Sequence, residues 1–356
     1  MNSLRSQKLI DDRQLLMLLF LGRMFSMMTY SPGKEAVPGT VTLAAQPLAL
    51  LAEAALLLPA FWVLRRCKQD DLLGAVYRKN RFAGHFCAVA AMLVCQLESA
   101  RTITVQTDFL TGTIYRLPNR MGLLLALWAG ILYAVWLGLE SFARLSMGVF
   151  VVFVFLEGAL AVQALPHIDL INLHNPLEQG FVPILQGAAL SVGRCGELAA
   201  ALLLIPAVRG KAIKQTAVSA LLWTLSTAFV SFLVLTALGN FAALRSFPVY
   251  ALALAGGEGA VFGRLDALML LVWIFLAVIR GGMFQWLAAR CVFLISGRGK
   301  AFCIAASGAG SLLMAVFSHR LGQGWESPLL WGICLLSVAV GIPLLATLFP
   351  HGGKKP

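Results

Sequence analysis

The sequence predicts an all-α membrane protein with ten transmembrane helices in a single domain. Of its 356 residues, 59% are hydrophobic and only 12% are charged, and its mean hydropathy is +0.83. A soluble domain carries about 25% charged residues. The apolar residues also gather in runs of roughly 20, which is the length an α-helix needs to cross a bilayer. The short alternating segments typical of a β-barrel are missing from this pattern.

We expect each of these runs to be one span. The first run follows basic residues but lacks a small-x-small cleavage site, so it is predicted to be a span and not a signal peptide. The stretch "FAALRSFPVYALALAGG" is too short to cross and is expected to lie at the outer interface. The predicted spans are 14–30, 41–64, 84–107, 121–138, 146–165, 182–207, 215–238, 264–290, 300–318 and 328–349.

The net charge of +12 reflects membrane topology and not nucleic-acid binding. With the amino terminus inside, the inner loops hold 18 of the 28 Lys and Arg residues. This positive-inside distribution predicts that both termini are cytoplasmic. The inner basic clusters are expected to contact anionic membrane lipid, and no nucleic-acid partner is expected.

Ten spans divide into two five-helix halves, 1–165 and 166–356. Because each half has an odd number of spans, the second half enters the membrane from the opposite side. This is the condition for a 5+5 inverted repeat, a common plan among transporters. The plan predicts irregular first and sixth spans. The sixth fits well, with Pro183, Gly187, Gly193 and Gly196 ahead of a smooth apolar half.

Eight ionisable side chains are predicted near the middle of spans. Each costs about 2.5–3.5 kcal/mol on insertion scales and must face the protein interior or water. Acids and bases occur in both halves, so internal pairing is expected. The eight are Arg23, Glu53, Glu98, Glu157, Arg194, Glu197, Asp266 and Arg280.

The third span has a polar outer half in "LESARTITVQT". Glu98, Arg101, Thr102 and Gln106 share one helical face there, at offsets of three, four and eight. Two interpretations remain open: a vestibule for a ligand or ion, or a helix end solvated by headgroup water.

The sixth span places Arg194 three residues before Glu197, a spacing that allows pairing on one helical face. Gly193 and Gly196 leave backbone exposed beside them. One interpretation is a binding site on a broken helix. The other is a structural ion pair with close helix packing through small residues.

The eighth span opens with Arg264 and Asp266, which point to different faces because they are two residues apart. We predict structural roles for both, each tying the span to a different neighbour, and for Arg280 deeper in the span. The seven cysteines form no CxxC pair, so neither a metal site nor a cofactor is expected. We found no catalytic motif and do not expect an enzyme.

Three stretches resemble the B subunit of spore germinant receptors, a spore germination permease family within the amino acid–polyamine–organocation superfamily. "NPLEQGFVPILQGA" resembles the family's entry to the sixth span. "GRCGELAAALLLIP" resembles its glycine–glutamate step, which runs on to a proline. "FPVYALALAGGEGAVFGRLDALMLLVWIF" is similar to the signature around the eighth span. The matching positions are Gly196, Glu197, Pro206, Pro248, Arg264, Asp266 and Trp273.

The resemblance implies an amino-acid-transporter-like fold in the inner membrane of a spore. It implies sensing of a small-molecule germinant, usually an amino acid, together with germinant receptor A and C subunits. The chain departs from the family in the first span, where Phe25 and Met27 stand in place of a Gly-x-Gly.

We expect a ligand site between the first, third, sixth and eighth spans. The predicted ligand-binding residues are Ser26, Glu98, Thr102, Gly187, Gly193, Arg194, Gly196 and Glu197. The predicted function is nutrient sensing that triggers germination. The alternatives are a secondary transporter of amino acids or small amines, with proton coupling through Glu98 or Glu197, and an ion-conducting subunit.

Overall fold

A computed structural model describes residues 9–29, 39–67, 71–113, 119–178, 180–255, 265–321 and 327–348. These residues are almost entirely helical, which confirms the all-α class. The first half contains α1 (Asp12–Met28), α2 (Gly39–Ala44), α3 (Gln46–Cys67), α4 (Leu72–Lys79), α5 (Arg81–Thr113), α6 (Arg120–Leu137) and α7 (Leu139–Ala164). The second half contains α8 (Val182–Gly193), α9 (Gly196–Leu204), α10 (Ala212–Leu238), α11 (Phe241–Leu244), α12 (Pro248–Leu254), α13 (Leu265–Ser296), α14 (Lys300–Leu321), α15 (Pro328–Leu336) and α16 (Ile342–Leu348).

Eight helices of the described chain are long and apolar enough to cross a membrane, so the protein is an integral membrane protein. A ninth span results if α8 and α9, which meet at an angle of 42°, are taken as one. Helix α1 is shorter. Its 17 residues extend about 26 Å at 1.5 Å per residue, slightly less than the hydrocarbon core of roughly 30 Å.

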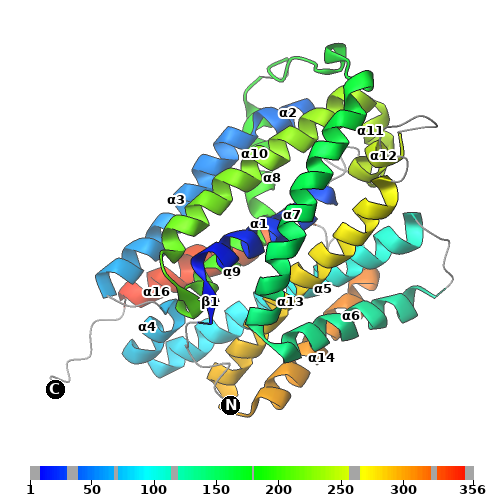
Figure 1. Cartoon of the computed structure of the whole chain (residues 1–356). Coiled ribbons are helices and arrows are strands. Elements are labelled where there is room, and N and C mark those ends of the chain that lie inside the picture. Colours follow the sequence, from blue (N-terminus) through cyan, green and yellow to red (C-terminus); the bar gives the residue numbers. More distant parts are fainter. Residues whose placement is uncertain are drawn as a thin grey trace.

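The helices pack around α1, α5 and α13. In Figure 1, α3 and α10 lie on one side of the molecule and α6 and α14 on the other, with α1 and α13 between them. Helix α13 packs along α5 and also contacts α1, α7 and α14. Every residue from Ile279 to Val292 is buried, so the middle of α13 is enclosed by protein and not by lipid.

Small residues allow this close packing. A Cβ on Gly281 of α13 would lie 2.5 Å from Cδ1 of Ile131 on α6, which only glycine avoids. Membrane helices commonly approach through such residues because close van der Waals packing drives their association.

The first predicted span is a continuous helix, and the sixth is broken. Helix α1 runs without interruption to Met28, and Phe25 and Met27 are buried side chains within it. By contrast, α8 ends at Gly193 and α9 begins at Gly196. Of the two irregular spans that the inverted-repeat plan predicts, the described chain therefore contains the sixth.

Short elements complete the described chain. A two-residue parallel ladder joins β1 (Ile10–Asp11) to β2 (Val208–Arg209), which ties the start of α1 to the end of α9. A π-helical turn, Ser337–Gly341, lies between α15 and α16. The stretch predicted to lie at the interface forms α11 and α12, and α12 packs against α10 and α13.

Candidate functional site: buried charges at a broken helix

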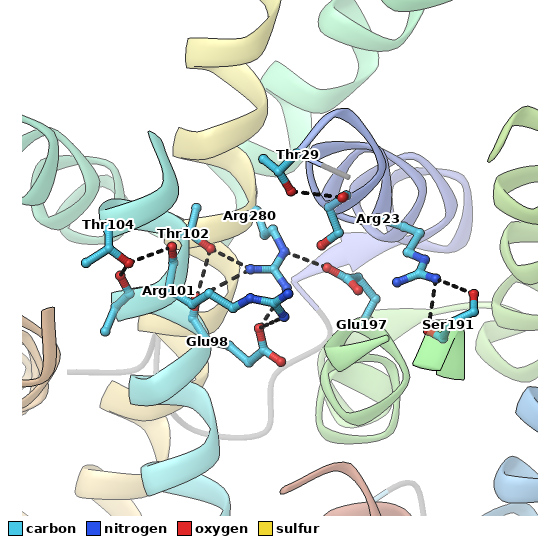
Figure 2. A network of polar contacts seen from close by, with 11 residues as sticks. Arg23, Thr29, Glu98, Arg101, Thr102, Thr104, Ser191, Glu197 and Arg280 are labelled. Carbon is cyan, nitrogen blue, oxygen red and sulfur yellow. Dashed lines mark hydrogen bonds and ion pairs between the residues drawn. The ribbon is translucent and has the colours of Figure 1, made fainter. Parts of the chain in front are cut away.

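Arg280, in the enclosed part of α13, is the centre of a buried polar network (Figure 2). Its Nε donates to Oε1 of Glu197 at 2.7 Å, and its Nη2 donates to Oε2 of Glu98 at 2.7 Å. Its Nη1 donates to Oγ1 of Thr102 at 2.6 Å and to the carbonyl oxygen of Glu98 at 3.4 Å. One guanidinium thus joins α13 to both α5 and α9.

The helices place these partners for simple geometric reasons. Glu98 and Thr102 are one turn apart on α5 and therefore face α13 together. Glu197 lies in the first turn of α9, immediately after the break. A Cβ on Gly196 would lie 2.3 Å from Oε1 of Glu98, so the glycine lets the carboxylate approach the start of α9.

The network is nearly closed to solvent. The side chains of Arg280, Glu98 and Glu197 are 1%, 3% and 0% exposed. Arg101 adds a second guanidinium, with its Nη1 4.0 Å from Oε2 of Glu98 and its charged end 4.6 Å from the Trp331 ring. Two guanidinium groups therefore face two carboxylates, and this pairing offsets part of the cost of burying four charges.

A second group of buried charges lies on the other side of Glu197. Nη2 of Arg23, on α1, donates to both the carbonyl oxygen and the hydroxyl of Ser191 on α8, each at 3.1 Å. Oε2 of Glu53, on α3, accepts a hydrogen bond from Nε1 of Trp223 on α10 at 3.0 Å. Arg23 and Glu53 are 6% and 2% exposed. These contacts join α1, α3, α8 and α10 around the end of α8.

Two buried polar atoms lack partners where the groups meet. Within the described chain, neither Nε of Arg23 nor Oε2 of Glu197 makes a hydrogen bond. Glu197 packs against α1 beside Arg23, because a Cβ on Gly22 would lie 3.4 Å from Cγ of Glu197. A donor with positive charge and an acceptor with negative charge thus remain available on facing helices, an arrangement suited to a zwitterion.

The structure gathers four of the predicted ligand-binding residues around Arg280: Glu98, Thr102, Gly196 and Glu197. Gly193 ends α8 at the break, and Gly187 is buried earlier in the same helix. Ser26 is half-buried on α1, and its carbonyl oxygen accepts from the Thr29 hydroxyl at 2.9 Å. The structure shows no contact of these last three residues with Arg280 within the described chain.

Arg194 and Glu197, whose spacing allows pairing on one face of a continuous helix, lie on either side of the break. Arg194 is the C-cap of α8, whereas Glu197 belongs to α9, so the spacing of a continuous helix does not apply. Glu197 pairs with Arg280. Arg280 was predicted to have a structural role, and it ties three helices together. Asp266 is half-buried in the first turn of α13, and Arg264 lies outside the described residues.

Sequence reasoning left all four members of the second group out of the ligand-binding residues. Arg23 and Glu53 were recognised as mid-span charges, and that position was their signal. Ser191 and Trp223 carry no signal of their own, because a serine or tryptophan in an apolar run is ordinary. Glu157, the remaining mid-span acid, accepts a hydrogen bond from Ser226 on α10.

These features define a class: an integral membrane protein of packed helices, with paired buried charges where one span is broken. Within the described residues, no group of three His, Cys, Asp or Glu side chains is arranged to hold a metal ion.

Comparison with known proteins gives the family. The model of the family described as "Spore germination protein" matches residues 87–319. The matched range is more than half of the chain and includes Glu98, Glu197 and Arg280. The chain therefore belongs to the spore germination protein family, as its resemblance to that family predicted. No curated protein matches the sequence.

Proposed function

We propose that this protein is the membrane subunit of a spore germinant receptor, which senses a small amino-acid-like nutrient and triggers germination. Family membership supports a role in germination. The observation that carries the proposal of a zwitterionic ligand is the pair of unpartnered atoms, Nε of Arg23 and Oε2 of Glu197. The ligand's carboxylate would bind Arg23 and its ammonium group would bind Glu197.

The broken helix suits such a sensor. Glu197 lies in the first turn after the break and also holds Arg280. A ligand that moves Glu197 toward Arg23 would alter the ion pair between Glu197 and Arg280. This change would in turn shift the positions of α5 and α13. In this proposal, binding energy at the break is converted into movement between helices, because only a state-dependent contact can shift an equilibrium.

We further propose ten spans in two inverted repeats of five. The eight long helices, the bent α8–α9 pair and the short α1 together give ten crossings. An even number of crossings places both termini on one side, and the basic inner loops favour the cytoplasm. The proposed location is the spore inner membrane, with germinant receptor A and C subunits as partners and no enzymatic activity.

Cysteine labelling tests this orientation. Asn175 is exposed in the segment between α7 and α8, which the topology places outside. An Asn175→Cys variant should react with a membrane-impermeant thiol reagent on intact cells, whereas the buried native cysteines stay unreactive. Reaction only after permeabilisation would reverse the proposed topology.

Complementation of a deletion strain tests the function. Spores that carry Glu197→Gln or Gly193→Leu should contain normal amounts of protein but respond weakly or not at all to the nutrient that wild-type protein senses. Glu197→Gln removes charge while keeping an oxygen acceptor for Arg280, and Gly193→Leu fills space without changing charge.

A matched control is Gly148→Leu on α7, where an added Cβ would meet nothing within 4 Å. This variant should respond as wild type does. Wild-type responses from both site variants, or loss of both proteins from the membrane, would remove the support for this ligand site.

A further inference from the structure

A basic hollow lies where α4 meets α5, at the end of the molecule away from the buried charges. It is open to solvent, has a volume of roughly 590 Å³ and is lined by Tyr77, Arg78, Lys79, Arg81 and His85. None of these lining residues is acidic, and Arg78, Arg81 and His85 are exposed. Within the described chain, Arg78 and Arg81 therefore present two exposed positive charges to an anion.

The chain around the hollow is held in place by packing and hydrogen bonds. Helix α4 buries its apolar face through Leu72, Leu73, Ala75 and Val76. Between the two helices, Oδ1 of Asn80 accepts from the backbone N–H of Phe82 at 2.9 Å and caps α5. The cationic side chains thus project from a fixed helix–turn–helix.

Two of the lining residues make structural contacts with their neighbours. Nζ of Lys79 donates to the carbonyl oxygen of Ala346 on α16 at 2.6 Å, which ties α4 to the last helix. The Tyr77 ring packs edge-on against His85, with ring centroids 5.2 Å apart. Arg78 and Arg81 remain as the groups available to a ligand.

The Tyr77 side chain belongs to the wall of the hollow. Its hydroxyl is buried and has no hydrogen-bond partner within the described chain. Burial, together with the nearby Cys291 and Cys87 thiols, raises the pKa of this phenol to about 12, so it keeps its proton at physiological pH. The phenol therefore adds no negative charge to the hollow.

An exposed apolar stripe on α5 begins beside the hollow. Phe82, Phe86, Val89 and Leu93 are 83%, 64%, 37% and 41% exposed. Their spacing of four, three and four residues places them on one face, next to the face that carries Arg81 and His85. In a membrane-spanning helix, such a face lies against lipid chains. The basic hollow therefore adjoins the apolar stripe on α5.

We propose that this hollow binds the phosphate headgroup of an anionic glycerophospholipid, with one acyl chain lying along the α5 stripe. Arg78 and Arg81 would pair with the phosphate. A free phosphate or soluble nucleotide would use the charges but not the stripe. Basic pockets between membrane helices are established headgroup sites in other proteins.

Native mass spectrometry of the purified full chain tests the proposal. The protein in detergent is titrated with phosphatidylglycerol or with phosphatidylcholine of the same acyl chains. Wild type should retain phosphatidylglycerol more strongly. Because each basic residue near a membrane contributes roughly fivefold in affinity, the double variant Arg78→Gln/Arg81→Gln should lose it by about tenfold or more.

The matched control is Lys211→Gln/Lys214→Gln, which removes the same charge from exposed positions before and within α10. It should bind as wild type does. A Phe82→Ser/Phe86→Ser variant should lose the lipid but bind the water-soluble headgroup glycerophosphoglycerol unchanged.

Equal retention of the two lipids by wild type would overturn the site. An equal loss in the lysine control would reduce the effect to overall charge and overturn it as well. A normal lipid affinity in the phenylalanine variant would leave only an anion site and contradict the assignment to lipid.

Discussion

The two groups of buried charges meet at Glu197 but differ in how completely their atoms are paired (Figure 2). Around Arg280, every guanidinium nitrogen donates to an oxygen of α5 or α9. In the second group, Arg23 bonds a serine and Glu53 bonds an indole, and Nε of Arg23 has no partner in the described chain. A central arginine with every nitrogen paired stabilises one arrangement of helices, whereas one with an unpaired nitrogen stays free to gain a ligand.

The contrast between the two groups predicts that the most destabilising substitution is at Arg280. Arg280→Ala leaves Glu98 and Glu197 buried without their shared cation, and breaking a buried pair from one side costs about 3–5 kcal/mol. We expect little folded protein in the membrane and a much lower thermal midpoint by fluorescence-detected size exclusion.

An exposed pair provides the control. Arg144 and Glu140 are 2.6 Å apart, but their side chains are 70% and 53% exposed. Arg144→Ala should therefore cost less than about 1 kcal/mol. Similar thermal midpoints for the two variants would show that the Arg280 network is not a structural clamp.

Gly196 should be the most sensitive small residue of the same group. Gly196→Ala places a methyl group against the Glu98 carboxylate that Arg280 holds, with the Cβ only 2.3 Å from Oε1. Such overpacking costs about 1–3 kcal/mol. Chemical or thermal unfolding in detergent should register the loss.

Gly148→Ala is the matched substitution, because its Cβ meets nothing within 4 Å. In a helix interior, alanine is about 0.5–1 kcal/mol more favourable than glycine. The control variant should therefore be as stable as wild type or more stable. If Gly196→Ala behaves in the same way, Glu98 is free to move and the network is looser than proposed.

Trp223→Phe tests the second group, where we expect a smaller loss of stability. The substitution removes the N–H that donates to Oε2 of the buried Glu53. The cost should be about 1–2 kcal/mol, because hydrogen bonds between membrane helices rarely contribute more. If this group binds the ligand, the nutrient response should change more than the protein level does.

Trp128→Phe controls for the loss of an indole. Nε1 of Trp128 donates to the carbonyl oxygen of Gly308 at 2.9 Å, away from both groups of charges. Its loss should leave the nutrient response intact. Equal effects of the two tryptophan variants on the response would argue against a role for the second group in sensing.

Much of the fold could be predicted from the sequence because bilayer thickness fixes the length of a span. The run 215–238 became Ala212–Leu238, and 182–207 became the α8–α9 pair within the same bounds. The start of α7 was predicted seven residues late. The sequence reading assigned Arg144 to an inner loop. In the structure, Glu140 and Arg144 pair one turn apart within the helix.

The broken helix was predicted because glycine and proline act locally, but the pairing of the charges was not. Arg280 is 83 residues from Glu197 and 182 from Glu98, so their contact depends on how three helices pack. The spacing of Arg194 and Glu197 suggested a local pair, and the break between them removed its geometric basis. Local patterns thus located the site, and tertiary packing decided its partners.

The smallest predicted effect is at Thr102, where one neutral group supports the fully paired Arg280 guanidinium. Its hydroxyl accepts from Nη1 of Arg280 at 2.6 Å and donates to the Glu98 carbonyl at 2.8 Å. Thr102→Val keeps the shape but removes both bonds. Nη1 still has the Glu98 carbonyl oxygen at 3.4 Å as an acceptor, so the cost should be near the average for membrane proteins, about 0.6 kcal/mol.

Thr102→Ser keeps the hydroxyl and should remain close to wild type, and thermal unfolding of the two variants measures the difference. A loss from Thr102→Val as large as that from Arg280→Ala would mean that the hydroxyl, and not the two carboxylates, fixes the guanidinium, and the contrast between the paired and partly paired groups would fail.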